Sequence, residues 1–169
     1  WLGAGRTLSY CGMSVAIGGW VLLHVLSMGG PERKRARRML ALGMTVSAAG
    51  TLVMMGAQAA QVGQSYRDVA AVASTTSGRW WVLRLFSTLA VGVAMWTTMT
   101  RRAKATTPWP AAVGAIALLA VTAAGGHAVT GQLPALAMVA TVVHLSSVSI
   151  WMGGLATLAL VVARSGRGD

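Results

Sequence analysis

The stretch from Leu133 to Ala163 constrains this chain most, because it carries no formal charge along its whole length. About 20 apolar residues are enough to cross the hydrocarbon core of a bilayer. The stretch therefore predicts a transmembrane helix, with Pro134 in its first turn, where no backbone N–H is needed. His144 lies near the middle of this helix. A titratable, metal-binding side chain is costly at that depth, so we expect it to face other helices and to belong to a functional site.

Four earlier apolar stretches predict four more spanning helices. The expected spans are residues 8–27, 39–62, 80–100, 110–128 and 133–163. A basic loop over residues 31–38 and a polar loop over residues 63–78, which could hold a short surface helix, separate the first three. The predicted fold class is all-α, a polytopic transmembrane bundle of about five helices. We expect one transmembrane domain over residues 1–169, forming part of a longer protein.

Charge gives the expected orientation of the bundle. The chain has a net charge of +11, but its basic residues form short clusters between apolar runs and are not interleaved with aromatic residues as on a nucleic-acid surface. They are topology signals, since the cytoplasmic loops of membrane proteins are enriched in Lys and Arg. One side would collect Arg33, Lys34, Arg35, Arg37, Arg38, Arg101, Arg102, Lys104, Arg164 and Arg167, and the other Arg6, Arg67, Arg79 and Arg84. We predict a multi-pass protein of the cytoplasmic membrane with its N-terminus outside and its C-terminus inside.

Few residues are available for chemistry. The carboxylates Glu32, Asp68 and Asp169 fall in predicted loops or in the tail, so no pair of them is placed for acid–base catalysis, and we expect no enzyme activity. Cys11 is the single cysteine, which excludes an internal disulfide and a thiolate metal cluster.

Three histidines and ten methionines remain. Imidazole binds copper, iron and zinc, and thioether sulfur selects Cu(I), so this combination favours a copper site. Methionine also fills cores, and any single Met is more often packing than ligand. The candidate metal ligands are His144, His127, His24, Met28, Met54 and Met55.

The three histidines are expected at three depths. If the last two helices form a hairpin, His144 lies about 12 Å deeper than His127, and His24 about 9 Å deeper still, at 1.5 Å per residue. Two imidazoles cannot share one ion over such distances. The spacing therefore predicts separate stations along a route and not one metal cage.

Two segments resemble a known family. The first segment is Gly126-His127-Ala128. The second begins with His144-Leu145, continues through five residues and ends with the run from Trp151 to Leu155, which reads Trp-Met-Gly-Gly-Leu. This pattern resembles the copper resistance protein D (CopD) family of integral membrane proteins. The resemblance implies copper transport across the cytoplasmic membrane, often beside or fused to a periplasmic copper-binding CopC-type domain. It also implies about eight spanning segments, of which this chain would hold five.

Two alternatives stay open at this point. Helical bundles with intramembrane histidines also bind haem, and a His/Met axial pair such as His144 with Met54 or Met55 would suit a b-type cytochrome. The chain could instead be a non-catalytic subunit of a larger membrane complex, because small residues such as Gly153 and Gly154 allow close helix packing.

Overall fold

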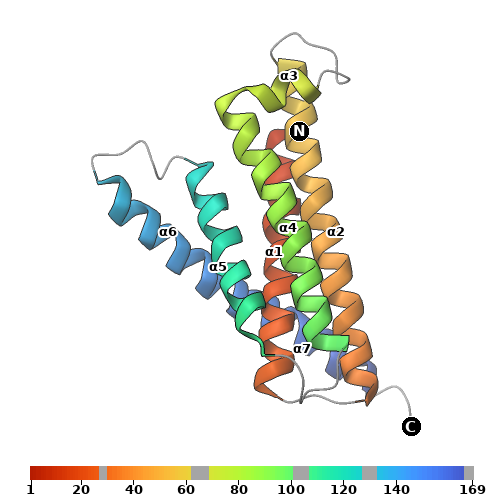
Figure 1. Cartoon of the computed structure of the whole chain (residues 1–169). Coiled ribbons are helices and arrows are strands. Elements are labelled where there is room, and N and C mark those ends of the chain that lie inside the picture. Colours follow the sequence, from red (N-terminus) through yellow and green to blue (C-terminus); the bar gives the residue numbers. More distant parts are fainter. Residues whose placement is uncertain (27–29, 62–68, 101–106, 127–132, 166–169) are drawn as a thin grey trace.

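The computed structural model describes residues 1–26, 30–61, 69–100, 107–126 and 133–165, and every regular element in these ranges is helical. In chain order the elements are α1 (Leu2–Val25), α2 (Gly30–Gln61), α3 (Val69–Ser74), α4 (Thr76–Thr100), α5 (Trp109–Ala124), α6 (Pro134–Val148), the π-helical segment η2 (Ser149–Gly153) and α7 (Gly154–Ser165) (Figure 1). The predicted all-α class is confirmed.

The long helices run in alternating directions, with the N-terminus at one end of the bundle (Figure 1). Four of the described helices are long and apolar enough to cross a membrane, namely α1, α2, α4 and the continuous helix Pro134–Leu160. The remaining apolar helix, α5, has 16 residues. At 1.5 Å per residue it is about 24 Å long, less than a typical hydrocarbon core of about 30 Å. It ends at Ala124 because Gly125 caps it, whereas we predicted a span to residue 128, which lies outside the described residues.

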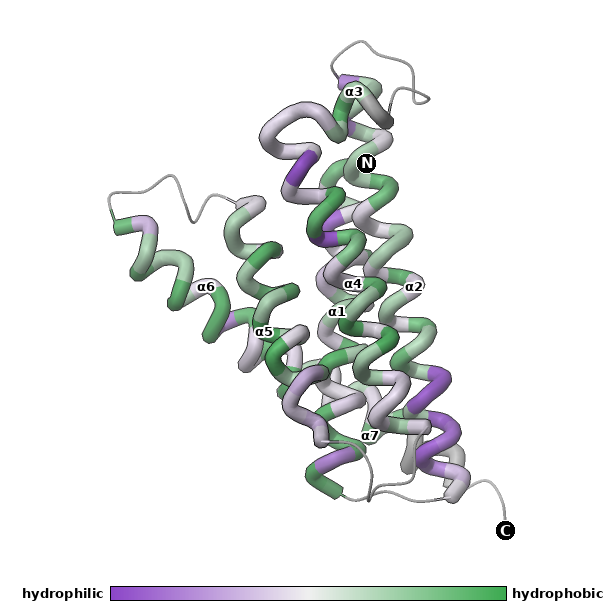
Figure 2. The backbone as a smooth tube through the Cα atoms, viewed as in Figure 1, coloured by the Kyte–Doolittle hydropathy of each residue, from purple (hydrophilic) through white to green (hydrophobic). Residues whose placement is uncertain are grey.

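The basic segment over residues 31–38 is helical and does not form the loop that we predicted. It is the first part of α2, which begins at Gly30, a glycine with φ of 52°. Pro31 suits a first helical turn, and the carboxylate of Glu32 interacts favourably with the N-terminal end of the helix dipole. Arg and Lys are good helix formers, so the charged segment continues the helix without a break. Figure 2 shows the hydrophilic start of α2 at the end of the bundle opposite the N-terminus.

The central pair of the bundle is α1 and α2. Gly12 and Gly43 lie at their crossing, and a Cβ on either glycine would meet backbone atoms of the partner helix within 3.0 Å. Beside this crossing the Ser9 hydroxyl donates to the Ser47 carbonyl (3.1 Å), and its oxygen lies 3.2 Å from Thr51 Oγ1. Small residues that let backbones approach, with hydroxyl hydrogen bonds between helices, are the usual means of packing helices in a membrane.

Methionine and aromatic side chains hold α4 against this pair. The hydrophobic core includes Met13, Trp20, Met95 and Met99, all at most 6 % exposed. The indole Nε1 of Trp20 donates to Thr98 Oγ1 at 2.9 Å, which links α1 to α4. Most of the buried methionines therefore serve as packing.

The helix from α6 to α7 is attached differently at its two ends. Its first part, α6, leans away from the bundle and touches α5, whereas η2 and α7 pack against α1 (Figure 1). Of the residues in the most apolar stretch of this helix, only 6 % are buried within the chain. We predicted one helix over residues 133–163, and the structure forms one helical run that contains the π segment where the chain meets α1.

Candidate functional site

His144 is exposed on α6, about 15 Å along the helix from Pro134 at 1.5 Å per residue. The neighbouring side chains Val142 and Leu145 are the ones that pack against the core. We expected the ring to face the other helices, and the described chain instead leaves it on an outer face of α6. Its role as a metal ligand stays a prediction.

His24 also lies on the surface, near the end of α1. Its Nδ1 is 2.8 Å from the carbonyl oxygen of Trp20, and the two rings lie 4.6 Å apart. Donation from Nδ1–H to that carbonyl would leave the lone pair of Nε2 free, as a metal ligand requires. Met28 and His127 lie outside the described residues.

Met54 and Met55 are buried on α2, at 2 % and 3 % exposure. Met54 borders the cavity described below, and its side chain lies over Gly5 of α1. In the described ranges, no group of three or more His, Cys, Asp or Glu residues could hold a metal ion.

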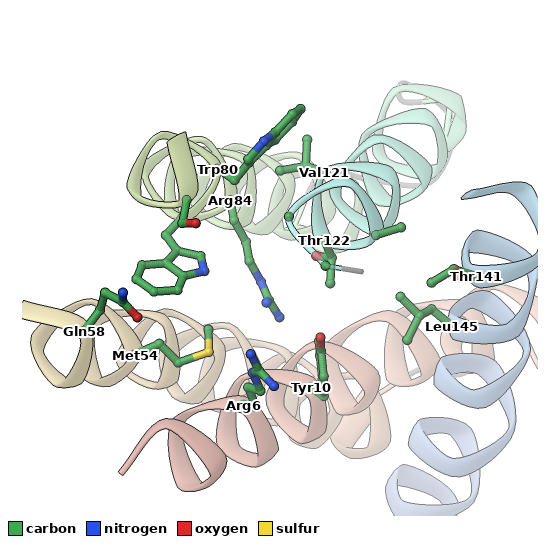
Figure 3. Close-up of a pocket in the computed structure, with 15 residues that line it drawn as sticks. Arg6, Tyr10, Met54, Gln58, Trp80, Arg84, Val121, Thr122, Thr141 and Leu145 are labelled. Atoms are coloured by element: carbon green, nitrogen blue, oxygen red, sulfur yellow. The ribbon is translucent and has the colours of Figure 1, made fainter. Parts of the chain in front are cut away.

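A cavity of about 640 Å³ lies among α1, α2, α4, α5 and α6 (Figure 3). It is near the end of the bundle that holds the N-terminus, because it borders Arg6 near the start of α1 and Gln58 near the end of α2. Its lining comprises Arg6, Tyr10, Met54, Gln58, Ser77, Trp80, Trp81, Arg84, Val121, Thr122, Ala123, Gly125, Gly126, Thr141 and Leu145.

Arg84 places a buried positive charge at this cavity. Its side chain is 5 % exposed, and its Cζ lies 4.9 Å from the centre of the Tyr10 ring in a cation–π contact. The buried Nε and Nη2 have no hydrogen-bond partner among the described residues. Figure 3 shows Arg84 and Arg6 projecting into the cavity from different helices.

From the sequence, Arg84 was predicted to lie in the outer half of its helix and was not predicted to be a site residue. A stronger signal was present, because an arginine within an apolar span is by default a functional candidate. Its proximity to Tyr10, which is distant in sequence, could not be read from spacing within one helix.

Comparison with known proteins finds no match: no family model, no curated protein and no solved structure matches this chain. The assignment of a function therefore depends on the residues themselves.

Proposed function

We propose that this chain handles copper in the cytoplasmic membrane, with His144 as its central ligand. The proposal is supported by the segment from His144 to Leu155, which resembles the CopD pattern, and by the number of soft side chains in the spans. Imidazole and thioether are suitable ligands for copper in a site without thiolates.

The observation that carries the proposal is the position of His144. It is an exposed imidazole near the middle of a helix that is otherwise apolar and long enough to cross a membrane. A polar ring facing lipid at this depth is unfavourable, because ionisable residues in membrane spans almost always face other protein groups or a water-filled cavity. Coordination of an ion, with the remaining ligands supplied by whatever covers this face of α6, would compensate for that cost.

The described candidates rank by their surroundings, whereas Met28 and His127 are placed from the sequence alone. His24 has a ring nitrogen available for a metal, so it suits a second station on the side of the basic end, together with Met28. His127 would collect the ion on the opposite side. Met54 is the weakest candidate, because it shares a cavity with two guanidinium groups that repel a cation.

The orientation follows from the basic start of α2. We propose that this end faces the cytoplasm and that the N-terminus faces outward, where a periplasmic CopC-type domain could deliver copper. Lys and Arg are retained on the cytoplasmic side of membrane proteins, which supports this direction.

Competition between the purified chain and a chromogenic Cu(I) chelator tests the proposal. We expect saturable Cu(I) binding that weakens about tenfold or more in His144→Ala, as loss of metal ligands and their supports does elsewhere. Val143→Ala, an exposed neighbour on the same helix, is the matched control and should bind like the unmodified chain. Equal Cu(I) affinity and stoichiometry in His144→Ala would refute the role of His144.

A further inference from the structure

Arg84 is a buried cation for which the described chain provides no counter-charge. Among the described residues that line its cavity there is no Asp or Glu. The described carboxylate Glu32 lies in the first turn of α2, whereas Gln58 at the cavity lies near the other end of that helix. These positions are about 39 Å apart at 1.5 Å per residue. A charge taken out of water normally requires a partner, because desolvation is costly.

The neighbours of Arg84 increase this need for an anion. Tyr10 contacts the guanidinium with its ring, but Nε and Nη2 of Arg84 remain without a hydrogen-bond partner among the described residues. Arg6 brings a second positive charge to the same cavity (Figure 3). Arg6 is exposed on α1, but two guanidinium groups at one cavity still repel each other, and an anion between them would convert this repulsion into attraction.

We propose that this cavity binds a phosphate group, with Arg84 as the main ligand and Arg6 as the second cation. Arginine is the preferred partner of phosphate because its planar group can donate two parallel hydrogen bonds. The amide of Gln58 and the hydroxyl of Tyr10 supply neutral donors at the same site.

The size and walls of the cavity restrict the ligand further. A volume of about 640 Å³ matches an organic ligand and exceeds what a bare phosphate group fills. Apolar side chains, among them Val121 and Leu145, complete the lining beside the indole of Trp80. The ligand is therefore a phosphate ester with an apolar portion, either the head group of a membrane lipid or a soluble phosphate ester.

The purified chain, in a phosphate-free detergent and with metals removed by a chelator, allows a direct test by calorimetric titration. One arm uses dihexanoyl phosphatidylglycerol as a soluble lipid, and the other uses phenyl phosphate as a soluble ester. We expect saturable binding in at least one arm, and the arm that binds identifies the source of the phosphate. Because no copper is present, the result is independent of the copper proposal.

Variants of Arg84 test whether its guanidinium group binds the phosphate. Binding should weaken about tenfold or more in Arg84→Gln, since a hydrogen bond to a charged group is lost. Arg84→Lys should keep part of the affinity, because it retains the charge but not the planar group. Arg79→Gln, an exposed arginine on the same helix, is the matched control and should bind normally.

Thermal unfolding keeps the proposal testable if a variant folds poorly. The bound ester should raise the midpoint temperature of the unmodified chain and of Arg79→Gln, but not that of Arg84→Gln. Absence of saturable binding in both arms, or equal affinity in Arg84→Gln, would overturn the proposal.

Discussion

Gly153 of η2 and Ser14 of α1 bring their backbones so close that a Cβ on Gly153 would overlap the carbonyl oxygen of Ser14. On α1, a Cβ on Gly18 would likewise overlap backbone atoms of η2 and α7. The π segment therefore lies where the backbones of two helices come into direct contact, beside the paired hydroxyls of Ser14 and Ser149. Gly153, within the Trp-Met-Gly-Gly run, thus has a structural role in helix packing.

Substitution of Gly153 tests this packing. Gly153→Ala should lower the free energy of unfolding by about 1–3 kcal/mol, because the added methyl group requires a backbone shift. Gly154→Ala is a close control, since its Cβ would meet nothing nearer than 3.9 Å. Ala is favoured over Gly in a helix, so this control should be neutral or stabilising. Denaturant unfolding in detergent measures both variants, and equal stability of the two would contradict the close crossing.

The hydrogen bond from Trp20 to Thr98 should couple α1 to α4. A double-mutant cycle with Trp20→Phe and Thr98→Val should give a coupling free energy of about 0.5–1.5 kcal/mol, the usual contribution of one such bond. A cycle with Trp96→Phe in place of Trp20→Phe is the control, because Trp96 is 43 % exposed. Its coupling to Thr98→Val should be near zero. Additive effects in the first cycle would show that the bond does not contribute.

Cysteine labelling can determine the orientation in the membrane. In a Cys11→Ser background, Lys34→Cys and Ser74→Cys place single exposed thiols at opposite ends of the bundle. A membrane-impermeant maleimide added to spheroplasts should label Ser74→Cys at once and Lys34→Cys only after permeabilisation. The reverse pattern would contradict an outward N-terminus.

The sequence was sufficient to predict where most helices lie, because hydrophobic length is a local property. The helix over 80–100 was predicted to end at Thr100, where α4 ends in the structure. The start of α2 was missed because a charged segment was interpreted as a loop, although Arg and Lys favour a helix.

Side-chain direction was harder to predict. The helix that carries His144 is apolar on nearly every face, so no amphipathic pattern marks the side that packs. The inward orientation of His144 was inferred only from the energetic cost of placing an imidazole in lipid, and the structure places the ring on an outer face of α6. The contact between Arg84 and Tyr10 depends on how α1 and α4 pack, which a hydropathy pattern does not contain.

X-ray absorption at the copper edge tests the central claim most directly. The purified chain loaded with one equivalent of Cu(I) should show scattering from an imidazole nitrogen, and His144→Ala should lose that contribution while Val143→Ala retains it. A spectrum in which the nitrogen contribution is unchanged by His144→Ala, or in which copper has no protein ligand, would contradict the assignment of His144 as the copper ligand.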